Sequence, residues 1–116
     1  THRKYASSAV FGTGHEDPEK NEEIVKWKKL AKSVDTIVIM MGLSRIGIIS
    51  KQLIEGGMKK STPVAVIQNG TTPKQKMIVG TLTNIATKIK KEKMSPPANI
   101  IIGEVVKLHK TIGWKK

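Results

Sequence analysis

Two short glycine-containing turns hold the residue types most suited to chemistry. Met41-Gly42 follows the apolar run 36–41, and Asn69-Gly70 follows the apolar run 63–67. One interpretation is structural: Met41 ends a core strand, and Gly70 adopts a positive φ in a turn. The other is functional, because glycine lets backbone N–H and C=O groups approach a ligand closely. A Met side chain beside it offers a flexible apolar contact for a flat ring or a thioether. The pattern predicts a pocket and leaves its ligand open.

Other candidate motifs are weaker. Gly12-Thr13-Gly14 lacks the third glycine of a dinucleotide fingerprint, and no Gly-Lys-Ser/Thr follows it. His15 and Glu16 could ligate a metal, but His2 and His109 are distant in the sequence and no second ligand pair is evident. No serine stands in a nucleophile-elbow context. We therefore predict neither a metal site nor a catalytic residue.

The pattern of apolar residues predicts the elements that position these turns. Continuous β-branched runs indicate strands buried on both faces, and apolar residues at three- and four-residue intervals indicate helices. Ser44 and Thr83 are expected to be N-caps, and Gly56-Gly57 the end of a helix. The expected strands are 10–11, 36–41, 63–67, 77–79 and 98–102, and the expected helices run from 17 to 34, from 44 to 55 and from 83 to the break at 96–97. The short connection before 77–79 favours an antiparallel strand there.

This order of elements predicts an α/β domain over residues 1–116. We expect three layers, α/β/α, around a five-stranded mixed sheet that is mostly parallel. In such sheets ligands bind beyond the carboxyl ends of the strands. The turns expected at that edge are 12–14, 41–42, 69–70 and 103–104.

Length and composition allow one small domain. The chain has 116 residues, of which 38% are hydrophobic, so a partner surface would add usefully to its core. No apolar run reaches the ~18 residues of a membrane span, so no membrane association is expected. Cysteine is absent, and a cytoplasmic location is the default expectation.

Charge is the strongest compositional signal. The net charge of +12 indicates attraction to polyanions, which include nucleic acid, anionic membrane and acidic small molecules. The lysines recur in groups, which is typical of the solvated faces of helices. Aromatic residues make up only 3% of the chain and no stacking motif occurs, which argues against nucleic acid as the partner.

Several sequence blocks, in order and at compatible spacing, cover nearly the whole chain. They are THR (1–3), ASS (6–8), TGHE (13–16), IVIMMG (37–42), TPVAVIQNGTTPKQK (62–76), VGTL (79–82) and PPANIIIGEVVKL (96–108). Together they resemble the uroporphyrinogen-III C-methyltransferases of the tetrapyrrole methylase family. Met40 replaces the usual Tyr of the fourth block, and Lys76 the usual Arg of the fifth. The family's glycine-rich GGD loop does not occur.

The resemblance implies both a fold and an activity. It implies the carboxy-terminal domain of a two-domain fold that binds S-adenosylmethionine in the cleft between its domains. Members methylate uroporphyrinogen III twice to give precorrin-2, on the route to cobalamin and sirohaem, and usually act as homodimers. The family's cofactor contacts fall on Met41 and Gly70 in this sequence. Its other contacts belong to an amino-terminal domain absent from this chain, so the resemblance implies a chain that is inactive alone.

Three alternatives stay open. One is a methyltransferase of the same fold that acts on another precorrin. The second is a basic nucleic-acid-binding domain. The third is a folding and dimerisation unit. The substrate implied by the resemblance is a polycarboxylate, so part of the lysine excess would steer it towards the cleft. Arg3, Tyr5 and Arg45 are candidate carboxylate or tetrapyrrole contacts.

Overall fold

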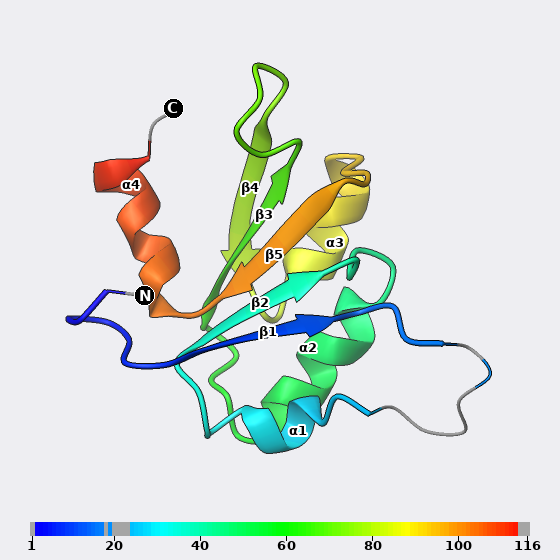
Figure 1. Ribbon diagram of the computed structural model, residues 1–116, viewed down its shortest axis with the longest axis vertical. Helices are drawn as coiled ribbons and strands as arrows, with labels where there is room; N and C mark the ends of the chain where they lie inside the picture. The colour runs from blue at the N-terminus through cyan, green and yellow to red at the C-terminus, as the bar shows by residue number, and fades with distance from the viewer. Residues whose placement is uncertain (1, 18, 20–23, 114–116) are drawn as a thin grey trace.

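The computed structural model describes residues 2–17, 19 and 24–113. Five strands form a single sheet in the order β1-β2-β5-β3-β4 (Figure 1). The strands are β1 (Ala9–Thr13), β2 (Thr36–Met40), β3 (Pro63–Gln68), β4 (Lys76–Thr81) and β5 (Ala98–Ile102). The helices are α1 (Trp27–Leu30), α2 (Ile46–Glu55), α3 (Ile85–Lys91), the 3-10 helix η1 (Glu104–Leu108) and α4 (His109–Ile112). All five predicted strands are therefore present.

The sheet is mixed, as predicted, but it is not mostly parallel. Only β1 and β2 pair in parallel, whereas β5 is antiparallel to both β2 and β3, and β4 is antiparallel to β3. The prediction of parallel neighbours was wrong because the last strand inserts between β2 and β3, which point the same way. Its apolar run marks a buried strand but does not encode its direction. The α/β class, the five strands and the antiparallel β4 are confirmed.

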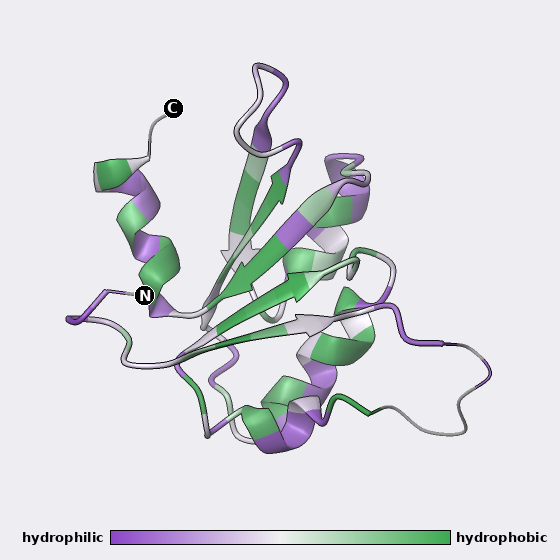
Figure 2. Ribbon diagram, viewed as in Figure 1, coloured by the Kyte–Doolittle hydropathy of each residue, from purple (hydrophilic) through white to green (hydrophobic). Residues whose placement is uncertain are grey.

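One face of the sheet carries the main core. Alternate residues of the three central strands are buried there: Ile37, Ile39, Val64, Val66, Ile100 and Ile102. Helices α1, α2 and α3 cover this face, and Figure 2 shows mainly hydrophobic residues in the central strands and a mixture of hydrophobic and hydrophilic residues along the helices. Of the apolar stripe predicted for the first helix, Trp27 and Ala31 are buried, but Ile24 is 62% exposed and lies outside the helix. Within the described residues this helix is limited to Trp27–Leu30, and residues 18 and 20–23 of the predicted helix lie outside them.

The opposite face is only partly covered. Element η1 contacts β3 and β5, and α4 continues directly from η1, away from α1, α2 and α3 (Figure 1). Ala65 and Val106 are buried, but Phe11 of β1 and Met40 of β2 are exposed. The third layer is therefore small. Neither η1 nor α4 was predicted from the pattern of apolar residues.

Helix α2 ends at Gly56-Gly57, as the sequence predicted. Gly57 has φ 107°, in the left-handed region that favours glycine. Its N–H donates to the carbonyl of Ile54 and the N–H of Met58 donates to that of Leu53, both at 3.0 Å. This pair of bonds is the Schellman motif.

The two predicted N-caps were wrong. Arg45 and Asn84 occupy the cap positions, and neither makes a side-chain cap bond. The hydroxyl of Thr83 instead donates to the carbonyl of Lys60 at 3.2 Å. A tight turn precedes α2, with the N–H of Arg45 bonded to the carbonyl of Gly42, and this turn places Ser44 before the cap. None of the helices in the described part of the chain has the length and apolar composition needed to cross a membrane.

Candidate functional site

The first corner of the site forms where β1 and β2 end. Met41 follows β2 with φ 55°, a left-handed conformation that is rare for a residue with a side chain. The N–H of Gly14 donates to the carbonyl of Met40 at 2.8 Å and holds the two strand ends together. A Cβ on Gly14 would lie 2.5 Å from the Cα of Gly42, and a Cβ on Gly42 would lie 2.5 Å from Cγ2 of Ile39. Glycine is therefore required on both sides of this contact.

The second corner forms where β3 ends. Asn69 has φ 52° and Thr71 has φ 67°. The N–H of Asn69 donates to the carbonyl of Pro97 at 3.0 Å, and the carbonyl of Asn69 accepts the hydroxyl of Thr72 at 2.7 Å. The left-handed residues flank Gly70, and among the described glycines only Gly57 and Gly103 have a positive φ. The structural interpretation that gave Gly70 a positive φ was therefore wrong.

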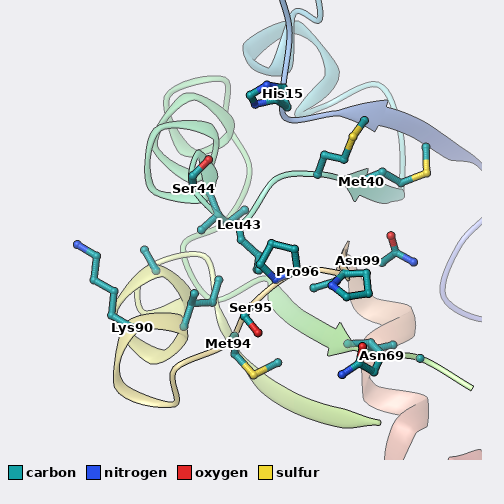
Figure 3. Close-up of a pocket in the computed structure, with 18 of the residues that line it drawn as sticks. His15, Met40, Leu43, Ser44, Asn69, Lys90, Met94, Ser95, Pro96 and Asn99 are labelled. Carbon is teal, nitrogen blue, oxygen red and sulfur yellow. The ribbon is translucent and has the colours of Figure 1, made fainter. Parts of the chain in front are cut away.

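Both corners line one cavity. Because β2 and β3 point the same way, their carboxyl ends lie at the same edge of the sheet, although β5 separates them. The cavity has a volume of about 1410 Å³ and is lined by Met41 and Gly70, and also by His15, Asn69, Lys90 and Asn99. Figure 3 shows side chains converging on it from the strand ends, from α2 and α3, and from the segment before β5. The predicted meeting of the two turns at one edge is thus confirmed.

The turn at 103–104 lies elsewhere. The N–H of Gly103 donates to the carbonyl of Pro63 at 3.0 Å, at the beginning of β3. A Cβ on Gly103 would lie 2.5 Å from the carbonyl oxygen of Asp35, just before β2. Its expected place at the ligand edge was wrong because β5 runs in the opposite direction to β2 and β3.

The three candidate carboxylate contacts do not line the cavity. Arg3 and Tyr5 precede β1, whose first residue pairs with the first residue of β2 at the opposite edge. Arg45 lies in the turn before α2, next to the cavity-lining Ser44 and Ile46, but is not itself part of the lining. The structure therefore does not bring these side chains together with Met41 and Gly70.

Sequence reasoning missed the contribution of the segment between α3 and β5. Met94, Ser95, Pro96, Pro97 and Asn99 all line the cavity. Their involvement depends on the position of β5 between β2 and β3, which no local pattern specifies. His15 was considered only as a metal ligand, yet it also lines the cavity. Within the described ranges, no three His, Cys, Asp or Glu side chains gather in a way that could hold a metal ion.

The lining suits a bound molecule that is partly flat and apolar. It combines Met, Leu, Ile and Pro side chains with a few amides and hydroxyls, and among the described residues that line it Lys90 is the one Lys or Arg. Pockets for cofactors are mostly apolar with a small number of placed polar groups. The described residues of this lining include no Asp or Glu, so they offer no carboxylate to pair with His15 or Lys90. The arrangement is suited to binding and orienting a ligand.

Known proteins resemble both this sequence and this fold. The sequence profile of the tetrapyrrole (corrin/porphyrin) methylases matches residues 1–86. An "S-adenosyl-L-methionine-dependent uroporphyrinogen III methyltransferase" of Methanosarcina barkeri is 45% identical over 116 residues, which are 100% of this chain and 46% of that protein. A "Siroheme synthase" of Nitrosomonas eutropha is 46% identical over 114 residues, or 98% of this chain and 24% of that protein. The chain thus spans about half, or less, of the length of these relatives.

Solved structures agree with the sequence matches. A uroporphyrin-III C-methyltransferase from Thermus thermophilus superposes with a TM-score of 0.77 at 29% identity, over 93% of this chain and 45% of that one. Its complex with S-adenosylhomocysteine gives the same TM-score and covers 47% of that chain. The family profile matches 86 of the 116 residues, and all 116 residues of this chain align with the M. barkeri relative. This chain therefore belongs to the tetrapyrrole (corrin/porphyrin) methylases.

Proposed function

We propose that this chain is the carboxy-terminal domain of an S-adenosylmethionine-dependent uroporphyrinogen-III C-methyltransferase. The complete enzyme would methylate its substrate twice to give precorrin-2. The observation that carries the proposal is the meeting of Met41 and Gly70 on one cavity, reached from two strand ends that point the same way. The names of the M. barkeri and T. thermophilus relatives support the choice of donor and substrate.

Methyl transfer from this donor requires the protein mainly to position the donor and the substrate. A sulfonium donor already carries an activated methyl group, so transfer to an electron-rich pyrrole carbon requires alignment and exclusion of water. The described lining residues include no carboxylate, which agrees with this requirement. Met41 would contact the donor through its exposed side chain, and Gly70 through a backbone that no side chain shields. Both would position the donor and neither would react.

The chain alone would supply one wall of the site. It matches only 46% of the M. barkeri relative, so the remaining part of that protein has no counterpart here. We propose that this part corresponds to an amino-terminal domain that completes the cleft. The homodimer and the cytoplasmic location expected above stay predictions, and sedimentation of the assembled protein would test the first.

A methyl-transfer assay tests the proposal. The chain is joined to the unmatched part of the M. barkeri relative, and the fusion receives labelled S-adenosylmethionine and uroporphyrinogen III. We expect two methyl groups per product molecule by mass spectrometry, and no turnover by the chain alone. The unmatched part without this chain is the matched control. Turnover by the chain alone would contradict its role as one wall. Methylation of another precorrin but not of uroporphyrinogen III would favour the alternative substrate.

A further inference from the structure

The side-chain amide of Asn99 is unusual among the amides of this chain. Gln68, Gln75 and Asn84 each use their side-chain oxygen to accept a backbone N–H, at 2.7, 2.8 and 2.8 Å. In the part of the chain that the structure describes, the amides of Asn69 and Asn99 make no such bond, and both residues line the cavity. The buried side-chain oxygen of Gln52 in α2 also accepts no hydrogen bond, but Gln52 does not line the cavity. Asn69 and Asn99 are therefore the amides of the cavity lining that are available to a ligand.

The two free amides differ in how their residue type is explained. Asn69 has φ 52°, and Asn is one of the few residues that adopt this conformation readily. Asn99 lies within β5, where Asn is unfavourable relative to β-branched residues. Nothing in the backbone of β5 requires Asn at this position. Asn99 is exposed, so contact with solvent allows a polar side chain there, and its place in the cavity lining also makes its amide available to a ligand.

The surroundings of Asn99 are flat and apolar. In the sheet it pairs with Met40 of β2 on one side and with Ile67 of β3 on the other. Pro96, Pro97 and Ala98, which precede it, also line the cavity. Lys90 comes from α3, and Figure 3 shows it on the far side of the cavity from Asn99 and Met40. The cavity is therefore polarised, with an amide among apolar groups at one end and a cation at the other.

An amide in apolar surroundings recognises a particular kind of ligand edge. The Asn side chain presents a donor and an acceptor side by side in one plane. Adenine presents the complementary pair, an amino group next to a ring nitrogen, and Asn binds it through two hydrogen bonds. The thioether of Met40 and the side chain of Ile67 can contact the two faces of such a ring. The charged amino-acid end of the methyl donor fits better near Lys90.

We propose that Asn99 recognises the adenine ring of the methyl donor through this paired hydrogen bond. Asn99 is thus a specificity-determining residue that selects an adenine nucleoside over a deaminated one. The inference rests on the proposed function, because it takes the donor to be S-adenosylmethionine. It predicts the orientation of the donor in the cavity, with its base over β5 and its amino acid towards α3.

The test compares two nucleosides on the chain as it stands. S-adenosylhomocysteine and S-inosylhomocysteine differ in that an oxygen replaces the amino group of adenine. Their affinities are measured by NMR titration at concentrations up to the millimolar range, following the amides of Met41 and Gly70. We expect the unchanged chain to favour the adenine form by about tenfold, as one bidentate pair provides. Asn99→Leu should reduce this ratio to about two or less.

Phe11→Leu is the matched control. It places the same Leu side chain on another exposed strand position, outside the cavity lining, and should leave the ratio unchanged. Asn99→Leu places a residue of better strand propensity on an exposed position, so it should fold. Equal affinities of the unchanged chain, or a ratio that survives Asn99→Leu or is lost in Phe11→Leu, would overturn the inference and leave the proposed function intact. If neither nucleoside shifts the amides of Met41 and Gly70, the inference and their assignment as donor contacts both fail.

Discussion

Met41 and Asn69 have nearly the same left-handed backbone, with φ 55° and 52°, at the ends of two strands that open onto one cavity. Asn adopts this conformation readily, whereas for Met it costs roughly 1–2 kcal/mol. The side chain of Met41 is 64% exposed, so burial does not offset this cost. A strained and exposed apolar residue at the rim of a cavity is better explained by binding than by folding.

Substitutions at Met41 should separate strain from binding. Met41→Gly relieves the backbone strain but adds freedom to the unfolded chain, so we expect stability to change by less than about 0.5 kcal/mol. Met41→Val keeps the strain and adds a β-branched side chain, so it should lower the free energy of unfolding by about 1 kcal/mol or more. Urea unfolding at constant m-value measures both effects.

The binding result at Met41 is a separate measurement. Met41→Gly should weaken binding of S-adenosylhomocysteine by about five- to tenfold, the loss of one apolar contact of modest size. Met41→Leu retains the apolar bulk and serves as the control, with a smaller loss. If Met41→Gly bound as tightly as the unchanged chain, Met41 would not be a donor contact.

The contact between Gly14 and Gly42 should tolerate no side chain. Gly14→Ala would place a Cβ 2.5 Å from a backbone atom, and Gly42→Ala would place one 2.5 Å from the buried Ile39. Each should destabilise the fold by about 1–3 kcal/mol through overpacking. Gly47→Ala is the control, because its nearest neighbour is Cβ of Ala86 at 3.8 Å and it lies in α2, where Ala should stabilise by about 0.5 kcal/mol. Equal unfolding midpoints for the three variants would contradict this account of the corner.

A substitution at Gly70 should weaken ligand binding much more than it lowers the stability of the fold. It lacks a positive φ, and an added Cβ would lie 3.3 Å from Cγ2 of Ile67, a contact that small movements can relieve. Gly70→Ala should therefore cost less than about 1 kcal/mol of stability. If the donor approaches this backbone closely, the same variant should weaken S-adenosylhomocysteine binding by about tenfold or more. Calorimetric titration of the folded variant checks this, and unchanged affinity would remove Gly70 from the site.

Much of this site could be predicted from the sequence because its corners are local features. Runs such as 36–41 and 63–67 mark buried strands, and the residues that follow them mark the turns. Met41 and Gly70 could therefore be placed at strand ends before any strand order was known. The antiparallel pairing of β4 was also predictable, because its connection to β3 is short.

The remaining features depend on long-range pairing. Strand β5 lies between β2 and β3 and runs antiparallel to both. Because of this direction, Asn99 at its beginning lines the cavity, whereas Gly103 after its end lies at the opposite edge. The predicted N-caps Ser44 and Thr83 each lie one position before the observed cap. Before α2, a turn closed by the hydrogen bond from the N–H of Arg45 to the carbonyl of Gly42 shifts the cap. Before α3, the hydroxyl of Thr83 bonds to the carbonyl of Lys60. Local propensity does not report such tertiary partners.

Lys107 should lose part of its basicity when its partner is removed. Its pKa is raised by the hydrogen bond to the carboxylate of Glu104 and by the attraction between the two charges. A raised pKa in the folded state adds stability below the unfolded-state pKa, and this stability disappears as the pH rises through the folded value. Glu104→Gln should lower the pKa of Lys107, as measured by NMR titration, and should reduce the loss of stability at alkaline pH, above the ordinary Lys pKa of 10.5. An unchanged pKa would show that the pair does not form in solution.

Salt should weaken the uptake of the polycarboxylate substrate if the charge of +12 steers it. Raising ionic strength from about 0.05 to 0.5 M shortens the Debye length severalfold, so the association rate of uroporphyrinogen III with the fusion enzyme should fall.

Two charge-reversal variants test where the steering charge lies. Lys91→Glu and Lys60→Glu each change the net charge by the same amount. Lys91 ends α3 beside the cavity residue Lys90, whereas Lys60 lies just before β3, at the edge opposite the cavity. Because steering depends on the field near the opening, stopped-flow measurements should show the larger decrease for Lys91→Glu at low salt, and the difference should shrink at high salt. If both variants lowered the association rate equally, or if the rate did not depend on salt, the lysines would not steer the substrate and would contribute to solubility alone.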